Sequence, residues 1–548
     1  MILFLGLMVR LFYWQVVKGS ELSRAAQSQY NSSKITSAPR GNIIASDGSF
    51  WVIRTDAWRI IANANLLKNS PSSIAEKLAP LLKDVDITQL TDLLSKKGAW
   101  ISLAQKVDGD VKKNIEAMSI PGIGFEPEES NYYPEASSAA QLLGFVGKDD
   151  SGADLGYFGL EGYYNLPLSG KPGFLGRQED VRGVPILLTG GREITAVNGV
   201  DLVTSVDKRI QIFAEQRLSE GIQKYEAVGG SVTVMDPFSG NIMAMAVSPS
   251  FDPAEYRMYN DSLFKNPLIS DSFEPGSIFK VLIMAAGLDA GVVTPDAVCD
   301  ICDGPLNVDK YQIKTWENKY RPGSTMTDVI VNSDNVGMAF VGQKLGADNL
   351  YDYLDKFGIG STTGVDLQGE FSPKMRKKGT WNVVDVATAS FGQGIAVTGI
   401  QMVRAVSAIA NGGYLVTPKV VTGIRGDGWE ETVKLDPPKR IISEKSAAEM
   451  AQMMVAAANL GEAKWAKIPG FNVAGKTGTA QIPVAGHYDP TNTIHSFIGF
   501  APVGKPKFVM LVTLQSPTSS LWAAETSAPL WYSIAKELFP YFGVQPDY

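Results

Sequence analysis

Two side chains near the middle of the chain have the types and the spacing for serine acyl chemistry. Ser277 is followed three residues later by Lys280, just after a Pro-Gly turn and at the start of an apolar segment. Residues three apart share one face of a helix, so Lys280 can reach the Ser277 hydroxyl. A lysine whose pKa is lowered by burial or by cationic neighbours can serve as the base for such a nucleophile. The pattern predicts a serine nucleophile at a helix start with lysine as its base.

A Ser-x-x-Lys string is weak by itself, because the same string also begins at Ser205 and at Ser533. Taken alone, Ser277 is compatible with a helix N-cap and Lys280 with a solvated helix charge. A second motif, Ser333-Asp334-Asn335, follows 56 residues after Ser277, where two expected helices meet. It supplies a further hydroxyl and an amide that could join the same site.

Residues 471–482 predict a strand that carries a third motif, Lys476-Thr477-Gly478-Thr479. The motif does not fit a phosphate-binding P-loop, because a strand continues where a P-loop would turn into a helix. A glycine inside a strand indicates the close approach of another backbone or of a ligand. The lysine and the two threonines would face a carboxylate, and an edge strand here could accept an extended peptide.

Composition excludes several other chemistries. The 548 residues include only two histidines, His487 and His495, which we interpret as structural or exposed, so a Ser-His-Asp triad or a His-rich metal centre is disfavoured. Only two cysteines occur, Cys299 and Cys302, and a short disulfide and free thiols both remain open for them. A net charge of −7 disfavours a general nucleic-acid binder. We expect no metal and no other cofactor.

The ordered set of motifs resembles the penicillin-recognising acyl-serine transferases, the penicillin-binding proteins and serine β-lactamases. Flanking segments look like class B penicillin-binding proteins, namely 273–277, 390–394, 410–413 and 473–481, and in the first half 40–43, 143–147 and 159–161. The resemblance covers essentially the whole chain. The sequence departs from the family at Ala45, Ser46 and Asn131, where the family has an acidic residue, a basic residue and an arginine.

The resemblance implies an α/β (α+β) transpeptidase fold, with an antiparallel sheet flanked by helices and a helical lobe. It also implies a peptidoglycan D,D-transpeptidase with Ser277 as nucleophile and Lys280 as its base. Ser333 would relay a proton to the leaving D-Ala with help from Lys476, and Asn335 would hold the substrate amide. Thr477, Gly478 and Thr479 would form the substrate-binding strand. The backbone N–H groups of Ser277 and Thr479 would form the oxyanion hole. A β-lactam would mimic the D-Ala-D-Ala end.

We expect three parts along the chain: a partial membrane anchor at 1–18, an N-terminal non-catalytic pedestal of the dimerisation type at 19–200, and a transpeptidase domain at 201–548. The anchor segment is too short for the roughly 20 apolar residues of a spanning helix. We therefore interpret it as the distal end of a single-pass anchor that starts upstream, which would place the catalytic domain outside the bacterial cell membrane. An amphipathic or core helix is the alternative.

Segments 390–398 and 497–502 look closer to the division (septal) branch of the family than to the elongation branch. We then expect stem peptides and β-lactams as ligands. As partners we expect a polytopic SEDS-family glycosyltransferase and other divisome membrane proteins. An elongation-type transpeptidase, a carboxypeptidase, or a membrane-anchored relative that hydrolyses or senses β-lactams are the alternatives. The long N-terminal module disfavours a β-lactamase.

Periodicity and turn residues predict the main elements. Expected strands are 51–61, the hairpin 230–247, 471–482, 495–502 and 507–515, and expected helices are 73–96, 202–226, several within 277–458, and 525–540. Residues 19–40 are helix-compatible. The second half would build one sheet from both of its ends, with a helical insertion between them.

Overall fold

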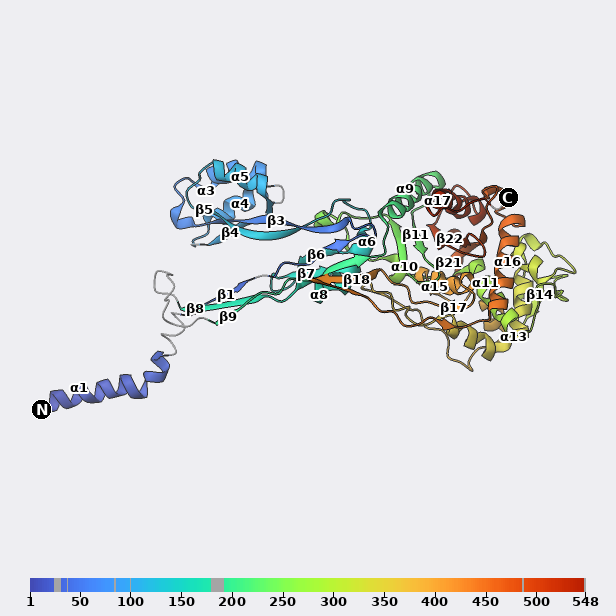
Figure 1. Cartoon of the computed structure of the whole chain (residues 1–548), viewed down its shortest axis with the longest axis horizontal. Helices are drawn as coiled ribbons and strands as arrows, with labels where there is room; N and C mark the ends of the chain where they lie inside the picture. Colours follow the sequence, from blue (N-terminus) through green and yellow to red (C-terminus); the bar gives the residue numbers. More distant parts are fainter. Residues whose placement is uncertain are drawn as a thin grey trace.

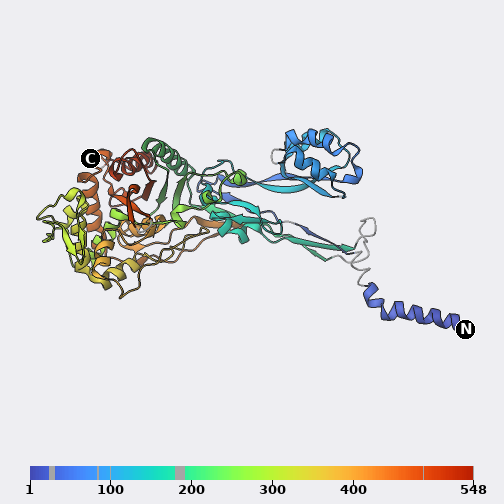
Figure 2. The same cartoon turned by 180° about the vertical axis from the view of Figure 1, so that it is seen from behind.

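The computed structural model describes residues 1–23, 31–36, 38–82, 85–98, 100–178, 192–484 and 487–546. The molecule is elongated, and helix α1 (Ile2–Phe12) and the large domain that carries the C-terminus lie at opposite ends (Figure 1). The view from behind in Figure 2 shows long strands that extend from the large domain toward the end where α1 lies. The candidate motifs all belong to the large domain.

A five-stranded antiparallel sheet forms the centre of the large domain, in the order β12-β11-β23-β22-β21. The strands are β11 (Gly229–Met235), β12 (Ile242–Ser248), β21 (Ala474–Val484), β22 (His487–Ala501) and β23 (Phe508–Gln515). The predicted hairpin, the three later strands and the assembly of one sheet from both ends are confirmed. The strand that carries the third motif, β21, is an edge strand, as expected.

Helices cover both faces of this sheet. Helices α9 (Lys208–Tyr225) and α17 (Ser527–Tyr541) pack on one face, where Leu218 and Trp531 belong to the same apolar cluster as Val232 of β11. On the other face, α15 (Gly399–Ala410) and the helices behind it share a cluster with Val509 of β23. Because both faces are covered, β11 is buried along its whole length.

The helical insertion forms a lobe beside the sheet, as predicted. Its helices are α11 (Lys280–Asp289), α12 (Met326–Val331), α13 (Asn335–Lys356), α14 (Val383–Ala389) and α16 (Glu444–Leu460). Helix α11 is apolar around its circumference and buried from Lys280 to Leu288, which is the pattern of a helix enclosed by other elements. Lys280 is the one charged residue in that buried stretch, so its burial has to be explained by the site.

The pedestal contains a small lobe of its own at its far end (Figure 1). Strands β3 (Phe50–Ala62), β4 (Ile101–Asp108) and β5 (Ile123–Tyr132) carry helices α3 (Pro71–Leu78), α4 (Ile87–Ser95) and α5 (Gly109–Ala117) around one apolar cluster. The predicted strand at 51–61 is confirmed. The helical stretch predicted at 73–96 is divided in two, because Pro80 lies in the short 3-10 helix Ala79–Leu81 and cannot continue an α-helix.

The pedestal sheet also includes strands from later parts of the chain. Strand β10 (Asp201–Thr204) pairs in parallel with β2 (Ile43–Ile44) and antiparallel with β18 (Val421–Gly426), which pairs in turn with β19 (Trp429–Thr432). The helix predicted over 202–226 is therefore wrong at its start. Helix α9 begins only after Asp207, whose side chain accepts hydrogen bonds from the next turn's backbone.

Pairing partners also decide the structure near the N-terminus. Residues Asn31–Thr36 form strand β1, which pairs with β8 (Gly173–Gln178), so the helix-compatible reading of 19–40 is wrong there. Helix α1 is followed by a short π-helix at Tyr13–Val17. In the part of the chain that the structure describes, every helix falls short of the length and apolar character that a membrane crossing requires. The anchor at 1–18 stays a prediction.

Cys299 and Cys302 form a disulfide, which decides between the two states that the sequence left open. The bond lies just ahead of the small hairpin of β14 (Leu306–Val308) and β15 (Tyr311–Ile313), in the helical lobe. Both cysteines are buried. The disulfide closes a tight turn between residues 299 and 302.

Candidate active site

The nucleophile candidate lies in a tight turn at the start of α11. Residues Gly276–Phe279 form a 3-10 turn, Ser277 is partly exposed, and Lys280 is the first residue of the helix itself. The position that precedes this turn is Pro275, and no side chain caps it. The predicted helix start is confirmed, and the alternative of Ser277 as an N-cap is wrong.

Lys280 is fully buried and bonds to the Ser-x-Asn motif. Its Nζ donates hydrogen bonds to the backbone oxygen and the Oγ of Ser333, the latter at 3.2 Å, and to Asn335 Oδ1 at 2.8 Å. Among the ion pairs of the described residues, none involves Lys280. Burial, reinforced by the positive charge of Lys476, lowers the pKa of Lys280 to about 7. The solvated-charge alternative is wrong, and at neutral pH much of this lysine is able to accept a proton.

The turn between α12 and α13 presents Ser333 and Asn335 to that lysine. Ser333 adopts a left-handed conformation with φ of 53°, which is costly for a residue other than glycine and occurs often at functional sites. Asp334 caps α13, because its Oδ1 accepts hydrogen bonds from the backbone N–H groups of Val336 at 2.8 Å and Gly337 at 3.1 Å. Asp334 therefore shapes the turn that aims its two neighbours at Lys280.

Lys476 on β21 is the second buried lysine of the site, with 4% of its surface exposed. Its Nζ donates to the backbone oxygen and the Oγ1 of Thr477, at 3.2 and 3.3 Å. Thr477 in turn donates to Glu462 Oε2 at 3.4 Å. Burial lowers the pKa of Lys476, and the carboxylate of Glu462 opposes that effect. The two buried lysines thus sit close enough to influence each other, with one carboxylate near Lys476.

Gly478 lets β21 approach the nucleophile turn. A Cβ atom at this position would lie 2.9 Å from Ile278 Cγ2 and 3.2 Å from the Pro275 oxygen, and closer still, 2.6 Å, to Ser496 Oγ. The predicted close approach of another backbone is confirmed, and that backbone is the turn that holds Ser277. One residue further, Thr479 Oγ1 accepts a hydrogen bond from the Ala523 N–H at 3.1 Å.

A pocket of about 80 Å³ brings the three motifs together. Ser277, Asn335 and Thr479 line it, one from each motif, and Glu274, Gln393 and Gln481 complete its polar wall. Lys476 and Thr477 line a separate small cavity with Glu462. Ser277 and Thr479 thus line the same pocket although they are 202 positions apart in the sequence. The buried lysines Lys280 and Lys476 belong to the same motifs as these two residues.

The loop 390–394 is tied to the nucleophile turn by two hydrogen bonds. The Gly276 N–H donates to the Gly392 oxygen at 3.0 Å, and the Gly394 N–H donates to Glu274 Oε1 at 3.0 Å. A Cβ on Gly392 would lie 2.1 Å from the Gly276 oxygen, so only glycine fits. In the sequence, this loop stood out only through its resemblance to the family. The pocket-lining positions of Glu274 and Gln393 were not predicted.

A pair of tryptophans near the same site was also missed. The rings of Trp316 and Trp522 meet edge to face with centroids 4.6 Å apart. Trp522 precedes Ala523, whose N–H bonds Thr479. Trp316 lies two residues after Lys314, whose backbone oxygen accepts from Asn335 Nδ2 at 3.1 Å. The pair therefore links segments attached to two pocket residues. No signal in the sequence connects aromatic residues that lie so far apart along it.

His495 has a structural role. It is fully buried, and its ring nitrogens bond Thr493 Oγ1 at 3.0 Å and Thr526 Oγ1 at 2.7 Å. Burial lowers the pKa of His495 to about 4, so it stays neutral. The structural reading of this histidine is confirmed, while the side chain of His487 lies outside the described ones. Within the described residues, no cluster of His, Cys, Asp and Glu could hold a metal ion.

Comparisons with known proteins cover both halves of the chain. Residues 230–538 match the family described as "Penicillin binding protein transpeptidase domain", and residues 35–204 match "Penicillin-binding Protein dimerisation domain". The chain is 30% identical to Stage V sporulation protein D of Bacillus subtilis, over 100% of this chain and 85% of that protein. It is 29% identical to peptidoglycan D,D-transpeptidase FtsI of Escherichia coli, over 90% of this chain and 78% of that one.

The fold is similar to that of solved structures. A crystal structure of penicillin-binding protein 3 from Mycobacterium tuberculosis, in complex with aztreonam, superposes with a TM-score of 0.73 at 26% identity. The match covers 94% of this chain and 98% of that one. The expected architecture of an antiparallel sheet with flanking helices and a helical lobe is confirmed by this likeness as well as by the sheet itself.

Proposed function

The chain belongs to the class B penicillin-binding proteins, a family of peptidoglycan D,D-transpeptidases, and we propose that it works through Ser277 as nucleophile. In the proposed reaction, one stem peptide becomes attached to Ser277 and is then passed to an amine of a second stem peptide. The observation that carries this assignment is Lys280, a fully buried lysine with a pKa lowered to about 7, three residues after a partly exposed serine.

Acylation begins when neutral Lys280 takes the proton of the Ser277 hydroxyl. The Ser277 oxygen attacks the carbonyl of the penultimate D-Ala, and the backbone N–H groups of Ser277 and Thr479 stabilise the oxyanion. Loss of one such donor costs about 2.7–4 kcal/mol in other enzymes. Ser333, which already bonds Lys280, passes a proton to the leaving D-Ala, and the charge of Lys476 assists this step.

Substrate binding uses the edge strand and the Ser-x-Asn turn. Asn335 holds a substrate amide, Thr477 and Thr479 bind the terminal carboxylate, and an extended peptide lies along the strand segment 477–479, which Gly478 allows to pack closely against the nucleophile turn. The free edge of β21 and its position in the sheet support this mode of binding. A β-lactam would follow the same path, because its carboxylate and strained amide mimic D-Ala-D-Ala, and would leave Ser277 acylated.

We place this activity in septal wall synthesis during cell division. The similarity to FtsI and the segments 390–398 and 497–502 support this branch, and an elongation-type role is the alternative. We also propose stem peptides and β-lactams as ligands, and a SEDS-family glycosyltransferase and other divisome membrane proteins as partners.

The proposed arrangement has a partial membrane anchor at 1–18, a pedestal at 19–200 and the transpeptidase domain at 201–548, with the catalytic domain on the extracytoplasmic side of the membrane. The apolar side chains of α1, such as Leu3 at 82% and Phe4 at 71% exposure, support contact of this helix with a membrane. Recovery of the full-length chain in the membrane fraction, and its loss when residues 1–18 are deleted, tests the anchor.

Covalent labelling with a fluorescent penicillin tests the nucleophile. The native protein should be labelled and Ser277→Ala should not, whereas a label that persists at full strength in Ser277→Ala contradicts the assignment. Ser205→Ala, which alters another Ser-x-x-Lys string, is the matched control and should be labelled as the native protein is.

Product analysis tests the acceptor. The purified protein, given a stem-peptide donor and an amine acceptor, should form the cross-linked product that mass spectrometry detects. Release of D-Ala with hydrolysis alone would favour a carboxypeptidase instead. Rapid turnover of nitrocefin would favour a β-lactamase.

A further inference from the structure

The pocket around Ser277 has one charged side chain in its wall. Of the described residues that line it, Glu274 alone is charged, and it stands three residues before Ser277. Glu274 is partly exposed, so a molecule in the pocket can reach it. The two lysines of the site, Lys280 and Lys476, are buried. The pocket wall therefore presents a carboxylate beside the nucleophile.

The second half of the proposed reaction needs a negative group in this place. An aliphatic amine has a pKa of about 10, so it arrives as an ammonium ion at neutral pH. The positive charge of Lys476, which suits a donor's carboxylate, repels that ion, and Lys280 does the same whenever it carries its proton. An ammonium ion approaches such a site only where a carboxylate offsets the repulsion, and it must lose a proton before its nitrogen can attack.

The structure holds Glu274 in a defined direction. Its Oε1 accepts the Gly394 N–H at 3.0 Å, while Gly276, next to Ser277, bonds Gly392 at 3.0 Å. These two bonds tie both ends of the segment 274–276 to the loop 392–394. A carboxylate fixed in this way keeps its position relative to the Ser277 oxygen, which is what a group that positions a reactant requires.

We propose that Glu274 is the acceptor-binding residue, which holds the ammonium group of the incoming stem peptide beside acylated Ser277 and takes one of its protons. This rests on the proposed function. One proton passes from the ammonium ion to the Glu274 carboxylate, and the freed amine attacks the acyl carbonyl. The new C–N bond forms as the C–Oγ bond to Ser277 breaks. The second amine proton goes to the Ser277 oxygen through Ser333, and Glu274 releases its proton to water.

The test compares a cationic and a neutral nucleophile in Glu274→Gln. The amide keeps the shape of the side chain and an oxygen that can accept the Gly394 N–H, and it removes only the charge. With a stem-peptide donor, the ratio of aminolysis product to hydrolysis product is measured by mass spectrometry, once with a stem peptide that carries a free amine and once with hydroxylamine, which is largely neutral at pH 7. This ratio depends on the fate of the acyl-enzyme and is independent of its rate of formation.

We expect the ratio for the stem-peptide amine to fall tenfold or more in Glu274→Gln, and the ratio for hydroxylamine to change less than twofold. Asp271→Asn removes a charge from an exposed residue outside the pocket, and both ratios should stay at the native values. Equal losses for both nucleophiles in Glu274→Gln, or no loss for either, would overturn the proposal.

A second measurement needs only the native protein. Added salt should lower the aminolysis ratio for the cationic amine and leave that for hydroxylamine nearly unchanged, because ions screen the attraction to a partly exposed carboxylate. The same salt dependence for both nucleophiles would overturn the proposal even if Glu274→Gln failed to fold. Acyl-enzyme is followed in the same samples, so its absence would point to failure of the proposed function rather than of the acceptor assignment.

Discussion

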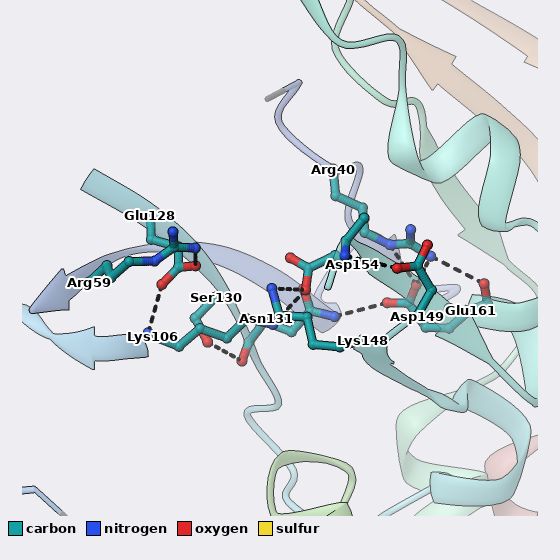
Figure 3. A network of polar contacts seen from close by, with 12 residues as sticks. Arg40, Arg59, Lys106, Glu128, Ser130, Asn131, Lys148, Asp149, Asp154 and Glu161 are labelled. Carbon is teal, nitrogen blue, oxygen red and sulfur yellow. Dashed lines mark hydrogen bonds and ion pairs between the residues drawn. The ribbon is translucent and has the colours of Figure 1, made fainter. Parts of the chain in front are cut away.

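The active-site cleft, where the three motifs meet, and the pedestal both bury cationic side chains, but these side chains bond to different kinds of group. In the pedestal, Arg40 and Glu161 form an ion pair in which 6% and 0% of the two side chains are exposed. Asn165 and Asn131 add hydrogen bonds of 2.8 and 3.0 Å to this pair, and Figure 3 shows the wider network. In the cleft, Lys280 is equally buried, but its three hydrogen bonds go to uncharged oxygens.

The difference shows how pairing decides what a buried cation can do. A guanidinium keeps its proton in proteins, so burial of Arg40 requires a counter-charge. An ammonium can lose its proton, and burial without a bonded carboxylate favours the neutral form. The pedestal therefore uses its buried cation to hold segments distant in the chain together, at residues 40 and 161, while the cleft is left with a lysine that is poised to take a proton.

The same network accounts for one departure from the family. Where the family has an arginine, Asn131 donates to Glu161, and Arg54, which is paired with it across β3 and β5, brings a cation into the cluster. Arg54 is less well paired than Arg40, because its Nε and Nη2 have no hydrogen-bond partner among the described residues. Burial lowers the pKa of Arg54.

The largest expected effect comes from giving the cleft a cation of the pedestal type. In Lys280→Arg the side chain stays protonated at every relevant pH and cannot accept a proton from Ser277, so general-base catalysis is lost. We expect the rate of acylation by a β-lactam to fall about 10³-fold or more. Stopped-flow mixing with a fluorescent penicillin measures this rate. Arg40→Lys is the matched exchange in the pedestal and should leave the rate per folded molecule intact; a loss below tenfold in Lys280→Arg would contradict the role of Lys280 as base.

Removal of the counter-charge in the pedestal should be the next largest effect. Glu161→Gln leaves Arg40 buried without a counter-charge, and such a change costs about 3–5 kcal/mol of the free energy of unfolding. Urea denaturation, in which unfolding of the pedestal strands is monitored by hydrogen exchange, measures the loss of free energy of unfolding. Asp110→Asn breaks the Lys113–Asp110 pair, whose side chains are 76% and 91% exposed, and should cost less than about 1 kcal/mol. Equal losses in both variants would mean that burial does not determine how much the Arg40–Glu161 pair contributes to the free energy of unfolding.

The third expectation concerns pH. Only neutral Lys280 can act as base, and its pKa is lowered to about 7, so the acylation rate should rise with pH and be about tenfold lower at pH 6 than on the plateau. A rate that is flat from pH 6 to 9 would contradict the assignment.

The lowered pKa of Lys280 also affects stability. The ordinary pKa of a lysine is 10.5, so between about pH 7 and pH 10.5 the unfolded chain binds more protons than the folded one. In that range this group makes the free energy of unfolding increase with pH. Lys280→Met should lose that slope.

The smallest expected effect lies at Arg54. Because this partly buried cation is incompletely bonded, Arg54→Met should leave the free energy of unfolding unchanged or raise it by about 1 kcal/mol. Denaturation of this variant beside Arg40→Met, which removes the paired arginine, makes the comparison within one cluster. A loss of stability in Arg54→Met as large as in Arg40→Met would show that bonding partners do not distinguish the two arginines.

Local patterns predicted the elements that carry the chemistry. The turn before Ser277, the junction at Ser333 and the strand around Lys476 could all be placed, because turn residues and periodicity act over a few neighbours. The strand Asn31–Thr36 and the start of α9 could not be placed, because pairing with β8 in one case and with β2 and β18 in the other outweighs local preference.

What the sequence by itself determined is therefore the set of reactive residues and the local structure around each of them, since residue type and short-range spacing suffice for both. Only the tertiary structure decided that Lys280 is buried beside Ser333, that Glu274 enters the pocket of Ser277, and that Arg40 meets Glu161. Burial, pKa and pairing of charge depend on contacts between segments distant in the chain. A single sequence does not specify those contacts residue by residue.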